Sequence, residues 1–177
     1  MTIHRPRLAC CAAIVLVAAA TAAVFAQGAH VLVPADKITW GPAPPALPAG
    51  AQISVLEGDP GRKGAVTLRL KFPARYTVPP HWHSMTERVT VLSGTLQVGM
   101  GDTLDPERSK ALAPGGFVSL PAKMHHYVWT STPTVVQVSL QGPFDIFYVN
   151  PSEDPQRKTS GRADQSLGLK DTRLAQR

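Results

Sequence analysis

The chain has 177 residues, of which 17% are charged, and a formal net charge of +6. Most of the excess charge lies near the two ends, because residues 28–153 contain ten Lys or Arg against nine Asp or Glu. The composition therefore predicts no basic face for nucleic acid, and the length suits a single domain better than two.

Residues 1–26 have the pattern of a secretory signal peptide. Two arginines precede an apolar run from Leu8 to Ala26, and small residues at its end offer a cleavage site. The alternative is an uncleaved membrane anchor, since about 19 apolar residues can just span a bilayer. Both cysteines lie in this segment, so the mature chain has no disulfide and no thiolate ligand. We expect a periplasmic or secreted protein, without stable membrane insertion after cleavage.

Residues 27–150 form a series of short apolar or alternating segments separated by Gly and Pro turns. The expected strands are residues 30–33, 51–57, 65–72, 76–78, 87–92, 95–100, 117–120, 125–130, 134–140 and 145–149. A proline-rich connector, residues 41–48, is expected to lie extended along the outside of a sheet, and residues 101–113 are expected to form an exposed loop. This pattern predicts an all-β sandwich or barrel. Residues 151–177 are polar and are expected to form a tail, either disordered or as a short helix.

The stretch His81-Trp82-His83-Ser84-Met85-Thr86-Glu87 carries the strongest chemical signal. Side chains alternate along a strand, so the two histidines point the same way, and Glu87 follows at an even offset. If the turn at residues 84–86 keeps this parity, two imidazoles and a carboxylate converge on one point. Such a set suits one divalent transition metal, namely Fe, Mn, Zn, Ni or Cu.

A second pair of histidines, His125 and His126, follows after about 40 residues that read as a hairpin, a loop and a strand. This path can bring the second pair back beside the first. One of its two members then completes a set of three imidazoles and one carboxylate. Adjacent residues on a strand face opposite ways, so parity alone leaves both histidines as candidates.

These two stretches resemble the two motifs of the cupin family. The spacing is that of His81-x-His83-x3-Glu87-x6-Gly94 for the first motif and Gly115-x5-Pro121-x4-His126 for the second. The resemblance implies a small antiparallel jelly-roll β-barrel. It also implies a metal held by His81, His83, Glu87 and His126, which favours His126 over His125 as the fourth ligand.

Three positions depart from the cupin pattern. Arg75 and Lys123 stand where the family has glycine, and Thr130 stands where its second motif closes with asparagine. None of these is a ligand position, so the departures concern the geometry of loops.

The family contains enzymes and binding proteins, so the function has several candidates. We expect an exported metal-dependent enzyme of oxygenase or lyase type that acts on a small organic molecule, with Glu87 as a ligand or as the catalytic base. Gln137 and Ser139 are candidate substrate contacts, although Val136 and Val138 compete for the inward face. The alternatives are a non-catalytic module that binds or senses a small molecule or metal, and a metal-free binder. A homodimer is expected, because small jelly rolls often pair.

Overall fold

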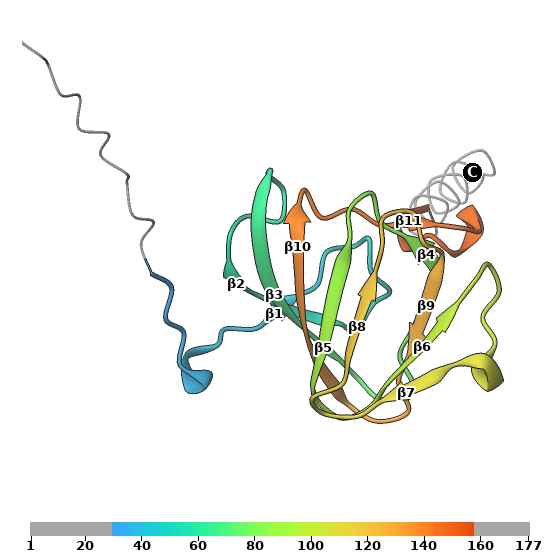
Figure 1. The fold of residues 1–177 in the computed structure, drawn as a ribbon, viewed down its shortest axis with the longest axis horizontal. Coiled ribbons are helices and arrows are strands. Elements are labelled where there is room, and N and C mark those ends of the chain that lie inside the picture. Colours follow the sequence, from blue (N-terminus) through green and yellow to red (C-terminus); the bar gives the residue numbers. More distant parts are fainter. Residues whose placement is uncertain (1–29, 158–177) are drawn as a thin grey trace, which may run out of the picture. The chain divides into compact units, whose positions relative to one another are not determined.

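The computed structural model describes residues 30–157 (Figure 1). Almost all of its regular structure is β-strand, joined by short 3-10 helices. In chain order the elements are η1 (Ala35–Lys37), β1 (Gly41–Pro42), β2 (Gln52–Glu57), β3 (Gly64–Phe72), β4 (Thr77–Trp82), β5 (Glu87–Ser93), β6 (Leu96–Met100), η2 (Pro106–Arg108), β7 (Lys110–Leu112), β8 (Phe117–Leu120), β9 (His126–Trp129), β10 (Thr134–Gly142), β11 (Phe147–Tyr148) and η3 (Pro151–Glu153). The predicted signal peptide and most of the predicted tail lie outside the described residues.

The strands form two sheets that face each other. One sheet has the order β1-β2-β3-β10-β5-β8, and the other has the order β11-β4-β9-β6-β7. Every strand pair is antiparallel, and most neighbours are far apart in sequence. This double-sheet arrangement is the jelly roll that the sequence predicted, and it sets the ends of β4, β5 and β9 around one cavity.

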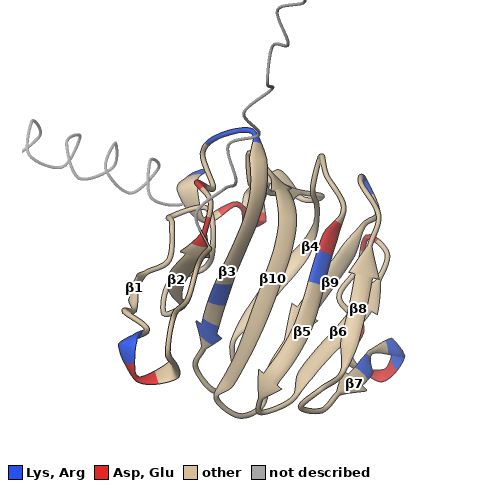
Figure 2. Ribbon diagram, turned by 60° about the vertical axis from the view of Figure 1, so that its left-hand side comes forward, with Lys and Arg blue, Asp and Glu red and all other residues tan. Residues whose placement is uncertain are grey.

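The core follows from the alternation of apolar residues on the two longest strands. On β3 the side chains of Leu68 and Leu70 are buried, and they pair in register with Val138 and Val136 of β10. The intervening residues face outward, as expected for strands of period two. Each fully buried aliphatic side chain stabilises the fold by about 1.5–3 kcal/mol relative to its exposed state. In the view of Figure 2, charged residues are few on the strands and lie mostly in turns and near strand ends.

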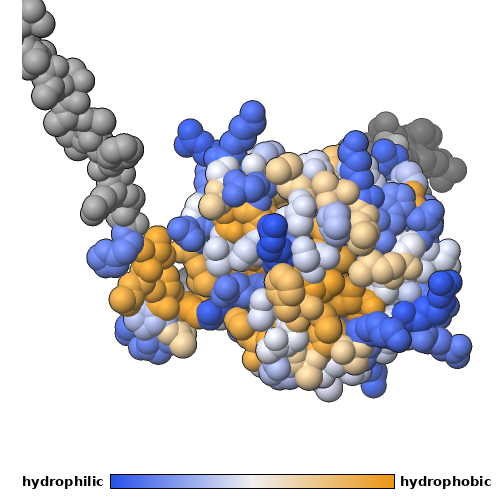
Figure 3. Space-filling model, viewed as in Figure 1, coloured by the Kyte–Doolittle hydropathy of each residue, from blue (hydrophilic) through white to orange (hydrophobic). Residues whose placement is uncertain are grey.

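Several predicted elements differ from the structure. Residues 30–33 form no strand, and Val31 and Leu32 are 54% and 75% exposed. Among the described residues no strand pairs with this stretch, so no sheet stabilises it as a strand. Figure 3 shows it as hydrophobic surface. The predicted loop at residues 101–113 contains η2 and β7, and the last predicted strand shortens to Phe147–Tyr148.

The proline-rich connector also differs from expectation. Only Gly41–Pro42 lies along a sheet edge, where it pairs with β2. The chain then turns, with the Leu47 N–H donating to the Pro44 carbonyl at 2.9 Å. This turn points the Leu47 side chain into the molecule, where it is buried. Within residues 30–157, no helix is long and apolar enough to cross a membrane.

Candidate metal centre

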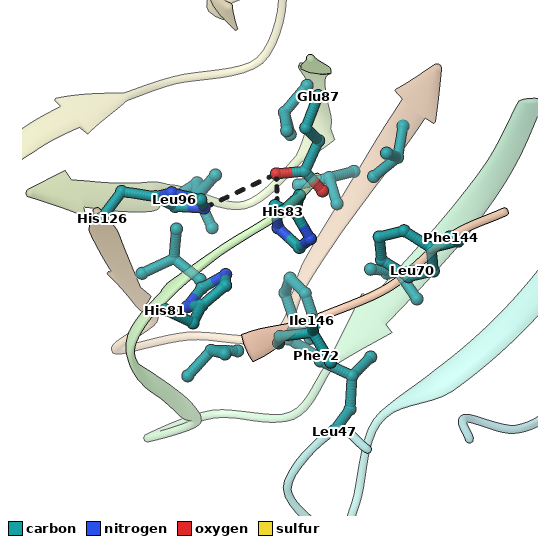
Figure 4. Close-up of a pocket in the computed structure, with 15 residues that line it drawn as sticks. Leu47, Leu70, Phe72, His81, His83, Glu87, Leu96, His126, Phe144 and Ile146 are labelled. Carbon is teal, nitrogen blue, oxygen red and sulfur yellow. Dashed lines mark ion pairs between the residues drawn. The ribbon is translucent and has the colours of Figure 1, made fainter. Parts of the chain in front are cut away.

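Three elements bring the candidate ligands together (Figure 4). His81 lies on β4 directly opposite His126 of β9, and His83 follows at the end of β4. Between His83 and Glu87 the chain passes from one sheet to the other, so Glu87 faces the histidines from the opposite sheet. The convergence therefore depends on this corner between the sheets and not on continuous strand parity.

The four side chains form a compact buried cluster. One ring nitrogen from each of His81, His83 and His126 lies within 4.8 Å of the other two, which is a spacing that one metal ion can bridge. The Glu87 Oε2 atom is 3.4 Å from the His83 Nε2 atom and 3.6 Å from the His126 Nε2 atom. All four residues are buried.

The histidine rings are oriented by the backbone. The Nδ1 atoms contact carbonyl oxygens, His81 with Pro79 at 2.7 Å, His126 with Met124 at 3.0 Å and His83 with Asp145. A carbonyl only accepts hydrogen bonds, so each Nδ1 carries a proton and each Nε2 offers a lone pair. In the described part of the chain the buried Nε2 atoms of His83 and His126 have no hydrogen-bond partner. Buried polar atoms without partners and rings fixed through Nδ1 are what a metal ion requires, so the residues present fit one.

The electrostatics of the cluster favour a charged carboxylate. Burial alone raises the pKa of Glu87, but the His126 and His83 rings outweigh it and hold this pKa below its usual value. Burial alone lowers the pKa of His83, but the Glu87 carboxylate outweighs it and raises this pKa. Burial, together with the neighbouring His126 and His83 rings, lowers the pKa of His81 well below its usual value. Without metal the raised pKa of His83 therefore favours a second proton on this ring, at Nε2 beside Glu87, which a bound cation would displace.

His125 and His126 have different surroundings. The His126 side chain is 1% exposed and belongs to the cluster, whereas the His125 side chain is 38% exposed. His125 contacts Asp102 instead, with 2.6 Å between the Nδ1 and Oδ1 atoms. The structure therefore brings His126, and not His125, beside the other three candidates.

Two residues that stand where the cupin pattern has glycine keep a backbone conformation typical of glycine. Arg75 has φ 58° and Lys123 has φ 63°, both in the left-handed region. These residues lie in the turns before β4 and β9, and the Lys123 N–H donates to the His83 carbonyl at 2.8 Å. Thr130 is buried, and its hydroxyl donates to the Pro73 carbonyl at 2.9 Å, in the turn that contains Arg75. The departures are therefore accommodated without loss of the turns that position the histidines.

The cavity beside the cluster has apolar walls. Its volume is about 40 Å³. Within residues 30–157 its lining, besides the four candidate ligands, consists of apolar side chains from both sheets and from two loops, namely Leu47, Leu70, Phe72, Val78, Val89, Leu96, Val128, Val136, Val138, Phe144 and Ile146. The volume is room for only a few water-sized molecules, since one water needs roughly 10–15 Å³.

Gln137 and Ser139 do not line this cavity, contrary to the expectation that they contact substrate. On β10 the buried positions are Val136 and Val138, so the two polar residues lie on the other face. Gln137 accepts a hydrogen bond there from the Arg69 side chain at 3.2 Å.

Asp145 is a residue that the sequence analysis did not single out. Its carbonyl contacts the His83 Nδ1 atom, and its carboxylate accepts a 2.8 Å hydrogen bond from the Ser84 N–H and a second one from the Ser84 hydroxyl. Next to it, Phe144 stacks on the His83 ring with 5.4 Å between ring centroids. No spacing rule predicts this role, because it is carried by a backbone carbonyl from a distant loop.

Residues 26–147 match the model of a family described as a domain of unknown function, DUF4437. The chain belongs to the DUF4437 family. No curated protein matches it.

Solved structures similar to this DUF4437 chain share its fold. A candidate acetylacetone dioxygenase from Methylibium petroleiphilum PM1 is 19% identical with a TM-score of 0.57, over 73% of this chain and 87% of that one. The polyketide cyclase RemF from Streptomyces resistomycificus is 22% identical with a TM-score of 0.51, over 62% and 78%. The DMSP lyase DddQ from Ruegeria pomeroyi DSS-3 is 20% identical with a TM-score of 0.50, over 63% and 60%. At these identities the similarity establishes the jelly-roll fold and leaves activity open.

Proposed function

We propose that this DUF4437 chain is an exported, metal-dependent enzyme that acts on a small organic molecule by an oxygenase-type or lyase-type reaction. The observation that carries the proposal is the cluster of three buried imidazoles, each with its Nδ1 atom on a backbone carbonyl, beside the Glu87 carboxylate. Export rests on the signal-peptide pattern of residues 1–26.

In this proposal His81, His83 and His126 hold one divalent transition metal, and Glu87 is the fourth ligand. Three nitrogen donors and one oxygen donor suit Fe, Mn, Zn, Ni or Cu. Such a metal, when bound, supplies a Lewis acid with open positions for a substrate oxygen.

The residues around the metal have separate tasks. The backbone carbonyls keep the imidazoles in place, so the ligand geometry exists before substrate arrives. The apolar walls exclude water and so strengthen electrostatic interactions within the cavity. Glu87 is held ionised by the neighbouring His126 and His83 rings despite its burial, so its carboxylate is charged and able to ligate a cation.

A second candidate function is reversible binding or sensing of a small molecule without turnover. The observation that favours it is the cavity lining, in which every described residue other than the four candidate ligands is apolar. In the part of the chain that the structure describes, the cavity therefore offers no acid or base beyond the four candidate ligands.

Incubation with compounds named in the neighbours separates the two functions. Metal-loaded protein is mixed with acetylacetone and with DMSP, and loss of each compound is followed by mass spectrometry beside a His83→Ala control. The enzyme proposal predicts metal-dependent loss of at least one small molecule of such a panel. Calorimetric binding with complete recovery of every compound would support the binding module instead.

We also propose that the protein is a homodimer. The support is the exposed apolar stretch at residues 31–33, which a second copy can cover. Sedimentation velocity of the mature chain is expected to give a dimer at micromolar concentration. A monomer at every concentration would contradict this.

A further inference from the structure

Two spaces in the molecule share one wall. The metal cavity and a larger outer groove, of about 620 Å³, are both lined by Leu47, Phe144 and Ile146. The remaining lining of the groove comes from β1 and β2, from the edge strand β11 and from the loops beside them. That lining consists of Pro42, Pro44, Ala46, Ile53, Val55, Pro60, Gly61, Asp145, Phe147 and Gln156.

Leu47 is the part of this wall that comes from the proline-rich connector. In Figure 4 its side chain extends from that loop into the pocket, among the apolar residues that face the histidines. Two tyrosine hydroxyls hold the loop on either side of it. Tyr148 donates to the Ala46 carbonyl at 2.8 Å, and Tyr76 donates to the Pro48 carbonyl at 2.6 Å. Leu47 is therefore fixed as a plug between the groove and the histidines.

The metal cavity behind Leu47 is too small for most organic ligands. About 40 Å³ holds only a few water-sized molecules, so a ligand of more than a few atoms cannot lie wholly inside. A larger ligand at the histidine cluster therefore extends beyond the cavity, and the groove is the space that shares a wall with it, formed by Leu47, Phe144 and Ile146. The groove is lined mainly by apolar and proline side chains, which suit an apolar body.

We propose that Leu47 is a specificity-determining residue that separates the metal cavity from an outer subsite, and that this subsite takes the apolar body of a ligand whose polar head reaches the histidines. The part of this proposal in which the polar head binds a metal rests on the proposed function. The role of Leu47 as a barrier does not depend on it.

The barrier is tested on chelator-treated protein with diethyl pyrocarbonate, which modifies histidine rings. Peptide mass spectrometry compares the rates at His83 and His126 with the rate at exposed His125 in the same molecule. Leu47→Ala is expected to raise the rates at the two buried histidines, relative to His125, by about tenfold or more, as a change of a few methylenes does in apolar pockets. Leu92→Ala, the same truncation at an exposed site on β5 outside both spaces, is expected to leave the ratio unchanged.

The outer subsite is tested on metal-loaded protein with two chelators that share one head group. Acetohydroxamate has a methyl body and benzohydroxamate has a phenyl body, and calorimetry gives the affinity of each. Leu47→Ala is expected to raise the ratio of the benzohydroxamate affinity to the acetohydroxamate affinity by about tenfold. The volume-conserving Leu47→Met is expected to keep the wild-type ratio. If Leu47→Ala does not fold, Leu47→Val carries both tests with a smaller expected change.

The outcomes distinguish this inference from the proposed function. Unchanged histidine modification rates in the folded Leu47 variants would overturn the barrier, whatever the metal content. Faster modification in a protein that binds no metal would support the barrier and remove the proposed function. An unchanged hydroxamate ratio together with faster modification would overturn the outer subsite alone.

Discussion

The two sides of the cavity are anchored in different ways. The polar side is formed by the three histidines and Glu87, and the apolar side is formed by Leu47, Phe144 and Ile146. The histidine rings are held by backbone carbonyls, mostly within two residues of the ring in sequence. The apolar side is held by long-range contacts, such as the Tyr148 hydroxyl on the Ala46 carbonyl. The chemistry of the site is therefore encoded locally, whereas access to it depends on loops from both ends of the domain.

The tyrosine anchors of the apolar side are insensitive to pH over the physiological range. Burial raises the pKa of the Tyr76 and Tyr148 hydroxyls above the ordinary tyrosine value, so both remain hydrogen-bond donors. On the polar side burial lowers the pKa of His83, but the Glu87 carboxylate outweighs it and raises this pKa. Perturbation of pH should therefore act on the ligands and leave the apolar wall in place.

The largest expected effect is loss of a ligand from the polar side. His126→Ala should lower metal affinity by more than about 100-fold, since even outer-shell changes at metal sites cost 10–100-fold. Competition with a chromophoric chelator measures this affinity. His125→Ala is the matched control, because His125 is adjacent in sequence but contacts Asp102. Equal losses of metal affinity in the two variants would contradict the assignment of His126, and not His125, as the ligand.

Acidification should release the metal. The pKa of His83 is raised in the metal-free chain by the Glu87 carboxylate, despite burial, so cation binding must displace a proton from it. Affinity should then fall with falling pH by about tenfold per pH unit for each proton displaced. Metal content after dialysis between about pH 7.5 and pH 5, the range in which histidine titrates, measures the effect. Retention that does not vary with pH would exclude imidazole ligands.

Asp145→Ala should have an intermediate effect on the polar side. The Asp145 carboxylate holds Ser84, and the carbonyl of the same residue contacts the His83 ring. Loss of the carboxylate frees the loop that carries this carbonyl, and with it the orientation of His83. We expect about a tenfold loss of metal affinity by the same chelator competition. Asp102→Ala, which removes an exposed carboxylate from His125, should change nothing. An Asp145→Ala affinity equal to wild type would mean that other contacts of the loop suffice to hold the carbonyl.

The smallest effect concerns the turns before β4 and β9. Arg75→Gly should raise the free energy of unfolding by up to about 1 kcal/mol, because a non-glycine residue in the left-handed region costs roughly 1–2 kcal/mol. Arg88→Gly, within β5, should instead lower it by about 0.5–1 kcal/mol. Urea denaturation measures both. Destabilisation in both variants would contradict the strain assigned to Arg75.

Much of the fold was predictable because its longest strands carry a regular alternation. The apolar residues of β3 and β10 occur at every second position, and the structure buries them together. The same alternation argued against Gln137 and Ser139 as cavity residues, since Val136 and Val138 already fill the inward face. Residues 30–33 show the limit of the pattern, because a short apolar run becomes a strand only where an edge is available to pair with it.

The polar side of the cavity was predictable to a greater extent than the apolar side. The spacing of the motif residues singled out the four side chains that the structure brings together, although a corner between sheets, and not strand parity, aligns Glu87 with them. Asp145 was missed because any residue offers a carbonyl, so its role leaves no trace in residue type. Leu47 was missed because prolines around it indicated an external strap, and only the turn after β1 directs its side chain inward.

The central claim is that the histidine cluster holds a metal, and elemental analysis tests it most directly. The mature chain is purified without an affinity-metal step, beside His83→Ala, and the divalent transition metals are measured per chain. The account predicts a stoichiometric metal in the wild type and its loss in His83→Ala. Absence of metal from the wild type, or equal metal in both proteins, would contradict it.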